Sequence, residues 1–169
     1  MTMQSELKLQ TVEDGMRAEL FTRADTRKTL LLPIVVGGAT AGVFDLMAAF
    51  VSSGFNAPRV IAAGLLGPQA IHSSQPVVWI LGLVLHFFVA FSAATVYCLA
   101  SLRLGFLKKH FVVCGLYFGL SVFVVMYLVV MPLCAFHFKG PYTLAALLQA
   151  IAVHMTLIGL PIGIARAGF

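Results

Sequence analysis

The segment Leu30 to Ser53, LLLPIVVGGATAGVFDLMAAFVSS, is apolar almost throughout and contains one acidic residue, Asp45. A helix needs about 20 predominantly apolar residues to cross a bilayer, and this segment is longer than that. All other acidic residues precede it: Glu6, Glu13, Asp14, Glu19 and Asp25. Asp45 is therefore the only acidic side chain of the apolar part of the chain.

One face of this predicted helix combines small residues with the acid. At 3.6 residues per turn it carries Gly38, Ala41, Gly42, Asp45, Ala49 and Ser52. Small residues let helix backbones approach closely in lipid, and Gly38 and Gly42 have the GxxxG spacing. Because an Asp near mid-bilayer costs about 3 kcal/mol or more, we predict that this face points at neighbouring helices. Asp45 is then either protonated or paired.

The composition of the whole chain is that of a membrane protein. Its 169 residues are 60% hydrophobic and 10% charged, and its mean hydropathy is +0.99. Four segments are long and apolar enough to span, at about 30–53, 77–101, 111–136 and 142–165. The short alternating segments of a β-barrel are absent. We predict an all-α integral membrane protein: a four-helix transmembrane bundle of residues 30–169 after a polar tail, residues 1–29. The tail is either mobile or a short interfacial helix.

The positive charge follows the predicted topology. Nine of the eleven basic residues lie before span one, between spans two and three, or after span four. The other two, Arg59 and Lys139, lie in the remaining two loops. This bias predicts that both termini are cytoplasmic. It also accounts for the net charge of +5 without a nucleic-acid partner.

A short apolar segment connects spans one and two. A turn at Gly54 to Arg59, with Asn56 as a candidate N-cap, precedes Val60 to His72, which is too short to span. We predict an interfacial or re-entrant helix that ends at Gly67-Pro68. Arg59 then either reaches down to Asp45 or extends to lipid headgroups.

The third and fourth spans repeat the GxxxG spacing. Gly115 and Gly119 lie in the third span, and Gly159 and Gly163 in the fourth, so we predict helix packing at both. On an α-helix Gly159 and His154 lie on nearly opposite faces. One of these faces would serve the bundle and the other an oligomer.

Four polar side chains on four different spans fall at a similar depth: Asp45, His86, Tyr127 and His154. With Arg59 they form a candidate polar cluster inside the membrane. Such groups are rare in spans and serve proton or substrate passage in many membrane proteins. The alternative is that each makes one interhelical hydrogen bond and only fixes the packing.

Two cofactor hypotheses are weaker. His86 and His154 could ligate a b-type haem, although no further haem signature is present. Met131, Cys134 and His137 could bind Cu(I), but their spacing turns them away from one another. Three cysteines, Cys98, Cys114 and Cys134, lie within spans and indicate neither a disulfide framework nor a zinc site. We therefore assign no metal and no cofactor.

Enzymatic motifs are absent from the sequence. It contains no Gly-rich phosphate loop, no nucleophile elbow and no HExxH, and Asp45 lacks the second carboxylate of an aspartyl protease. We expect that the protein is not an enzyme.

Several motifs occur together between residues 37 and 133. They are Gly42-x-x-Asp45, Ala63-Gly64-Leu65-Leu66-Gly67-x-x-Ala70, Gly82-x-x-x-His86-Phe87-x-x-Ala90, Ala94-x-x-Tyr97 and Met131-Pro132-Leu133. As a set they resemble an uncharacterised family of small four-span bacterial inner-membrane proteins. The resemblance implies an inner-membrane setting and assigns no activity, and His154 lies outside the matched region.

The sequence favours a non-enzymatic accessory or scaffold component of a larger membrane complex, in which the polar cluster is structural. The alternative is a small transporter or proton-coupled permeation unit that uses Asp45 and His86. Four spans are few for a monomeric carrier, so this alternative predicts a homo-oligomer.

Overall fold

The structure, a computed structural model, describes the backbone of residues 3–135 and 143–169. It describes the side chains of residues 12, 13, 15–17, 29–135 and 143–169. Within these ranges the secondary structure is helical and includes no strand. The elements are α1 (Met3–Ser53), η1 (Gly54–Asn56), α2 (Ala57–Leu66), η2 (Pro68–His72), α3 (Pro76–Arg103), α4 (Phe106–Lys109), α5 (Phe111–Val125), η3 (Met126–Val130), α6 (Met131–Leu133), α7 (Leu144–Val153), η4 (His154–Gly159) and α8 (Leu160–Gly168). The segments η1 and η2 are 3₁₀-helices, and η3 and η4 are π-helices.

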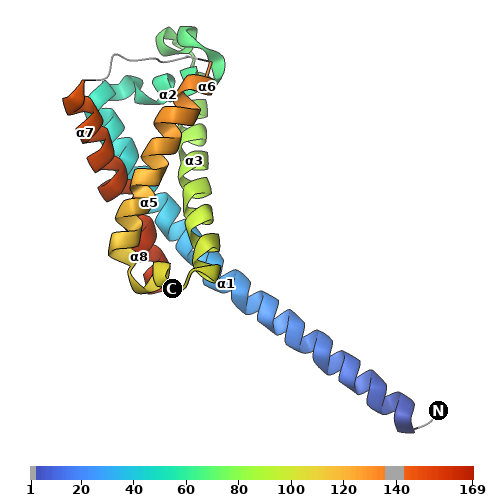
Figure 1. Cartoon of the computed structure of the whole chain (residues 1–169). Helices are drawn as coiled ribbons and strands as arrows, with labels where there is room; N and C mark the ends of the chain where they lie inside the picture. The colour runs from blue at the N-terminus through green and yellow to red at the C-terminus, as the bar shows by residue number, and fades with distance from the viewer. Residues whose placement is uncertain (1–2, 136–142) are drawn as a thin grey trace.

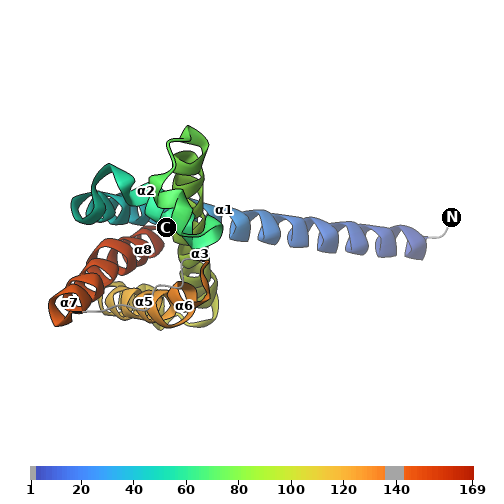
Figure 2. The same cartoon turned by 90° about the horizontal axis from the view of Figure 1, so that it is seen from above.

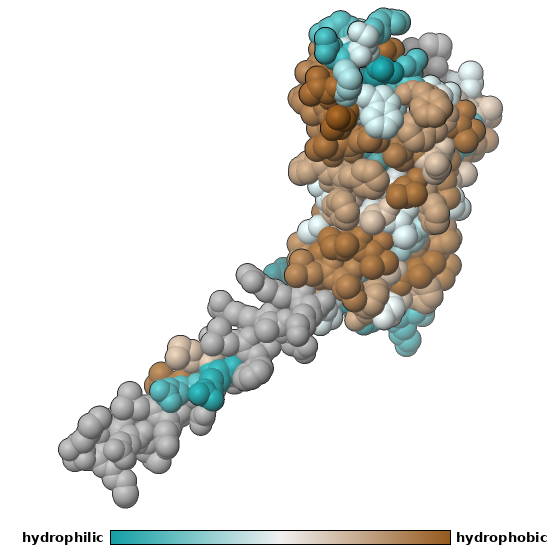
Figure 3. All heavy atoms as spheres, turned by 180° about the vertical axis from the view of Figure 1, so that it is seen from behind, coloured by the Kyte–Doolittle hydropathy of each residue, from teal (hydrophilic) through white to brown (hydrophobic). Residues whose placement is uncertain are grey.

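Four helical segments are long and apolar enough to cross a membrane, and they pack together (Figure 1). The first begins at Thr29 within α1, and the second is α3. The third runs Phe111–Leu133 through α5, η3 and α6, and the fourth runs Leu144–Gly168 through α7, η4 and α8. Hydrophobic residues cover the middle of the bundle surface (Figure 3). The predicted all-α, four-span fold class is confirmed.

Helix α1 extends well beyond the bundle. It is continuous over Met3–Ser53, with Pro33 inside it. Figures 1 and 2 show its first part projecting from the bundle as a rod. The backbone is not interrupted at residue 30, where the sequence analysis divided the tail from the membrane domain. Whether the projecting part lies on a membrane surface stays a prediction.

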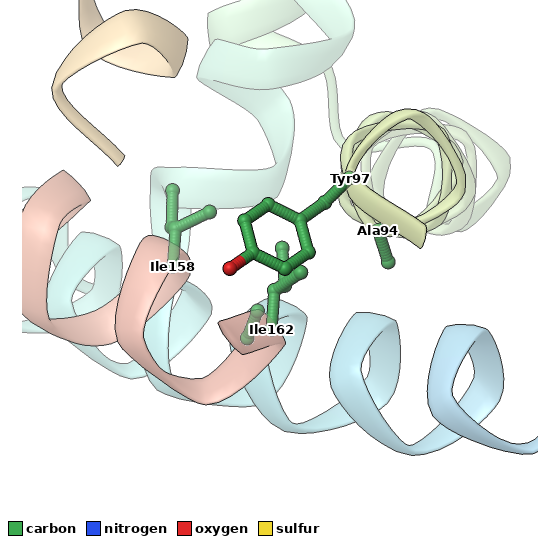
Figure 4. Close-up of a cluster of buried hydrophobic side chains, with 5 residues drawn as sticks. Ala94, Tyr97, Ile158 and Ile162 are labelled. Carbon is green, nitrogen blue, oxygen red and sulfur yellow. The ribbon is translucent and has the colours of Figure 1, made fainter. Parts of the chain in front are cut away.

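The second part of α1 packs between two other spans. It packs against α3 on one side and α8 on another, while α5 packs against η4 and α8. Tyr97 of α3 points into this junction toward Ile158 and Ile162, and with Ala41 and Ala94 these residues form a buried cluster (Figure 4). The Tyr97 hydroxyl donates a hydrogen bond to a backbone carbonyl, that of Leu107, at 3.0 Å. The polar end of this buried ring is thus satisfied.

Spans three and four contact each other backbone to backbone through their glycines. A Cβ atom on Gly159 would overlap the carbonyl oxygen of Gly115, and one on Gly119 would overlap the carbonyl oxygen of His154. A Cβ on Gly163 would lie 2.6 Å from the carbonyl oxygen of Phe111. All four glycines of the two GxxxG spacings therefore lie in one helix interface, where any side chain would push the helices apart.

A π-helix changes the face on which His154 lies. The segment η4 spans His154–Gly159, and its hydrogen bonds join residues five apart, so these residues return to about the same face. The backbone of His154 and Gly159 accordingly both contact α5, at Gly119 and Gly115. The expectation that His154 and Gly159 lie on opposite faces was wrong, because it assumed an α-helix where the chain forms a wider π-helical turn.

The short helix predicted between spans one and two is present as α2. It starts at Ala57 and ends at Leu66, where Gly67 has a φ of +88°, a conformation that other L-residues rarely adopt. Helix α2 packs against α3. At this contact a Cβ on Gly82 would overlap the carbonyl oxygen of Pro58. The predicted helix end at Gly67-Pro68 is confirmed.

An arginine is buried near the C-terminal end of α8. Arg166 is 4% exposed, and its Nε donates to the Oγ of Ser101 at 2.6 Å. The Ser101 hydroxyl in turn donates to the carbonyl oxygen of Cys98. These bonds join the last helix to the end of α3, on the side of the bundle opposite α2.

Candidate functional site: a polar cavity beside Asp45

Asp45 on α1 lies next to His86 on α3. The Nδ1 atom of His86 is 4.0 Å from Oδ2 of Asp45, and the side chains are 10% and 25% exposed, respectively. The close approach of the two helices at Gly42 makes this possible, since a Cβ there would lie 2.8 Å from the ring of Phe87. The Nε2 atom of His86 lies 2.8 Å from the carbonyl oxygen of Gly42. His86 therefore contacts both the backbone and the acid of α1.

The contact with Gly42 fixes where the His86 ring carries its hydrogen. A carbonyl oxygen can only accept, so Nε2 must donate, and the neutral ring then has its lone pair on Nδ1. Nδ1 faces Asp45 across a gap that one bridging water can span. One proton can thus reside on the carboxyl group or on Nδ1, and the pair is neutral overall in both arrangements. A neutral pair avoids the cost of a lone charge in the membrane.

Asp45 also borders a cavity of about 300 Å³. Residues of α1, η3, α7 and η4 line it: Asp45, Ala48, Ala49, Ser52, Tyr127, Ala146, Gln149, Ala150, Val153 and His154. Three members of the predicted cluster therefore meet at one cavity, and His86 adjoins it through Asp45. This volume is at the lower end of the range for small-molecule sites and is large enough for several waters.

Tyr127 and His154, the other two members of the polar cluster that line this cavity, lie in π-helices and share an aromatic neighbour. Tyr127 is in η3 and His154 begins η4. The ring of Phe123 lies 4.4 Å from the Tyr127 ring and 5.6 Å from the His154 ring, centroid to centroid. Nδ1 of His154 donates to the carbonyl oxygen of Ala150 at 2.8 Å, which leaves Nε2 as the acceptor in the neutral ring. π-Helical turns are rare and occur frequently at functional sites.

The cavity extends along α1 and the fourth span, with Asp45 and His154 at its inner end, and it is closed toward α8. Along α1 its lining runs from Ser52, next to the helix end, down to Asp45, and along the fourth span from Ala146 down to His154. Beyond that level, toward α8, the glycine contacts between α5 and the fourth span leave no room for side chains. Helix α7 has no buried residue, so the cavity lies beside the part of the fourth span with the least buried side chains.

Arg59 lies apart from this cavity. Its Nη1 donates to the side-chain oxygen of Asn56 at 3.1 Å, and it is not among the cavity's lining residues. In the part of the chain that the structure describes, the ion pair of Asp45 is with His86. Asn56 precedes α2 as predicted but makes no capping bond with its side chain. Asn56 thus does not cap α2 with its side chain, and Arg59 bonds to Asn56 rather than to Asp45. The extension of Arg59 to lipid headgroups stays a prediction.

Sequence analysis missed two residues at the site. Gln149 lines the cavity from α7, and Phe123 of α5 holds the rings of Tyr127 and His154. An amide within an apolar span is a signal that could have identified Gln149. No sequence signal separates Phe123 from the other phenylalanines of the spans.

The described residues contain no group of three or more His, Cys, Asp or Glu side chains that could hold a metal ion. His137, one of the three residues considered for Cu(I), lies outside the described ranges. For a haem, His86 would have to release its bond to Gly42 before Nε2 could bind iron. The haem hypothesis stays a prediction.

A larger groove of about 650 Å³ lies between α2, α3 and the end of span three. Its lining is aliphatic apart from Met126, Met131, Gly64 and Cys134. It contains no charged or amide side chain among its lining residues, in contrast to the Asp45 cavity.

Comparison of this chain with protein-family models, with curated proteins and with solved structures finds no match in any of the three. The sequence and the fold together indicate a multi-pass, four-span membrane protein in contact with the lipid bilayer.

Proposed function

We propose that this protein is a small proton-coupled transport unit in which Asp45 and His86 carry the proton. The supporting observation is that Asp45, which pairs with His86, borders a cavity large enough for water. A pair sealed between helices can fix packing but cannot exchange its proton. A pair at a hydrated cavity can pass the proton between the carboxyl group, Nδ1 and water.

The proposed setting is a bacterial inner membrane with both termini in the cytoplasm. The excess of Lys and Arg in the terminal segments and in the loop between spans two and three supports this orientation. The resemblance to small bacterial inner-membrane proteins supports the setting. Since the cavity begins near Ser52 and Ala146, at the bundle end away from the termini, it would then open toward the outer side.

A transport unit of this size is proposed to act as a homo-oligomer. Only four spans are available, and the fourth packs loosely along α7. A pathway through the membrane needs walls on all sides of the cavity, and a second copy can supply the missing one. No catalytic step is proposed, because the sequence contains no Gly-rich phosphate loop, nucleophile elbow or HExxH motif.

An accessory or scaffold role is the second candidate. The hydrogen bond from His86 to Gly42 favours it, because this bond joins α1 to α3 whether or not a proton moves. Under this hypothesis Asp45 orients His86, and its loss would weaken the bundle. Under the transport hypothesis its loss would stop proton movement and leave the fold nearly unchanged.

Reconstitution into liposomes with an entrapped pH-sensitive dye discriminates the two. An imposed proton gradient should collapse faster with the wild-type protein than with Asp45→Asn, while the two proteins unfold at nearly the same temperature. Glu13→Gln is the matched control, since it makes the same chemical change on an exposed residue of the projecting part of α1. A lower unfolding temperature of Asp45→Asn, with no proton flux in the wild type, would support the scaffold role instead.

A further inference from the structure

We infer that the Asp45 cavity binds a small primary aliphatic amine in its ammonium form. This inference rests on the proposed transport function and names its substrate class. Three features of the cavity carry it: the sign of its charge, its hydrogen-bonding groups and its aliphatic walls.

The charge of the cavity selects against anions. Among its lining residues Asp45 is the one acidic group, and none is Lys or Arg. Arg59, the nearest basic residue in sequence after α1, bonds to Asn56 instead. A cation can take the place of the proton on the neutral Asp45–His86 pair, whereas an anion meets no Lys or Arg on the lining.

The hydrogen-bonding groups favour a ligand that donates. Asp45 accepts through its carboxylate, and His154 accepts through Nε2 because its Nδ1 already donates to Ala150. The side-chain oxygen of Gln149 is a further acceptor on the same lining. A primary ammonium group has three N–H donors and can meet three acceptors at once, which a quaternary ammonium cannot.

The size and the lining of the cavity do not suit a bare metal ion. Hard metal cations take six or more oxygen ligands, and the lining includes only a few side-chain oxygens. The volume of about 300 Å³ also far exceeds that of a dehydrated ion. Four alanines and a valine, Ala48, Ala49, Ala146, Ala150 and Val153, form walls suited to methylene groups.

Binding would release one proton from the Asp45–His86 pair. The amine arrives as R–NH₃⁺, the carboxyl proton leaves to water, and the ammonium forms an ion pair with the Asp45 carboxylate. No covalent bond between heavy atoms forms or breaks, and the total charge is conserved. The described titratable groups that adjoin Asp45 are His86 from α3, Tyr127 from η3 and His154 from η4. Of these, His86 faces the carboxylate directly.

The test uses the full chain purified in detergent, with n-butylammonium as the probe. Binding is measured by titration calorimetry, and proton release is measured with a pH indicator in weak buffer. We expect saturable binding that is accompanied by proton release. 1-Butanol and butyrate, a neutral and an anionic molecule of similar length, should not bind.

Three variants locate the site. Asp45→Asn should weaken butylammonium binding about tenfold or more, since a charge-assisted hydrogen bond is lost. Ala146→Leu fills the cavity without touching the acid and should also weaken binding. Ala145→Leu is its matched control, because Ala145 is the exposed neighbour on α7 that does not line the cavity. Both leucine variants keep the helix propensity, so their helical circular dichroism should match the wild type.

The outcomes separate this inference from the proposed function. Equal binding by Ala146→Leu and wild type, or equal binding of 1-butanol and butylammonium, would overturn the inference. Proton flux in liposomes without any butylammonium binding would overturn the inference and leave the transport function standing. Butylammonium binding without proton flux would overturn the transport function and keep the cavity as an amine site.

Discussion

The imidazole of His86 is bonded on one side to the carbonyl oxygen of Gly42 and faces the carboxyl group of Asp45 on the other, with Nδ1 4.0 Å from Oδ2. Since Gly42 and Asp45 both belong to α1, one side chain of α3 joins the packing of the two helices to the protonation of the acid. A change in the proton on this pair therefore acts directly on the α1–α3 contact.

Removing this imidazole should affect both properties. We expect His86→Ala to lower the free energy of unfolding by about 0.5–2 kcal/mol, the range for an interhelical hydrogen bond in a membrane. It should also abolish proton flux, because Asp45 loses the partner that accepts its proton. Unfolding in SDS and the liposome assay measure the two effects. His72→Ala is the control, since His72 is exposed at the end of η2; unchanged flux in His86→Ala would contradict the role of the pair.

A methyl group in the glycine interface should disrupt the fourth span. Gly159→Ala places a Cβ against the backbone of Gly115 and Gly119, which cannot yield as a flexible side chain would. We expect a loss of about 1–3 kcal/mol in unfolding free energy, as for an overpacked core. Gly168→Ala, where nothing lies within 4 Å of the added Cβ, should leave stability nearly unchanged. Similar unfolding of the two variants would argue that the interface is looser than described.

The topology can be tested with single cysteines. In a background with Cys98, Cys114 and Cys134 replaced by Ala, Gln75→Cys lies before α3 and Gly168→Cys lies at the end of α8. If the basic segments are cytoplasmic, a membrane-impermeant maleimide should label the Gln75→Cys variant in intact spheroplasts. The Gly168→Cys variant should be labelled only after lysis. The reverse pattern would invert the proposed orientation of the cavity.

An optical spectrum and a native mass of the same detergent-purified sample test two further expectations. We expect no Soret band, because ligation of haem iron by His86 would require breaking its bond to Gly42. We expect the mass of a homo-oligomer, since four spans leave the cavity open on one side. A Soret band with a matching bound mass would make His86 and His154 haem ligands. A monomer that co-purifies with another membrane protein would favour the accessory role.

The sequence identified most members of the site but not their partners. Asp45 stood out as the only acidic side chain within the apolar part, and His86, Tyr127 and His154 as polar groups at a similar depth. The sequence also left open a pairing of Asp45 with Arg59, which required the connecting segment to dip into the membrane. The structure pairs Arg59 with Asn56 and Asp45 with His86, a choice set by the close approach of α1 and α3 at Gly42.

The sequence by itself determined the four spans, the all-α fold and the end of α2, because these depend on local properties. Hydropathy along the chain sets which segments enter lipid, and the positive φ at Gly67 stops the helix where it occurs. Only the tertiary structure decided which faces meet. The π-helix at His154–Gly159 rotates His154 onto the face of Gly159, and the packing of α7 places Gln149 on the lining of the same cavity as Asp45. Both depend on contacts between helices that are far apart in sequence. The residue pattern of a single helix carries no information about such contacts.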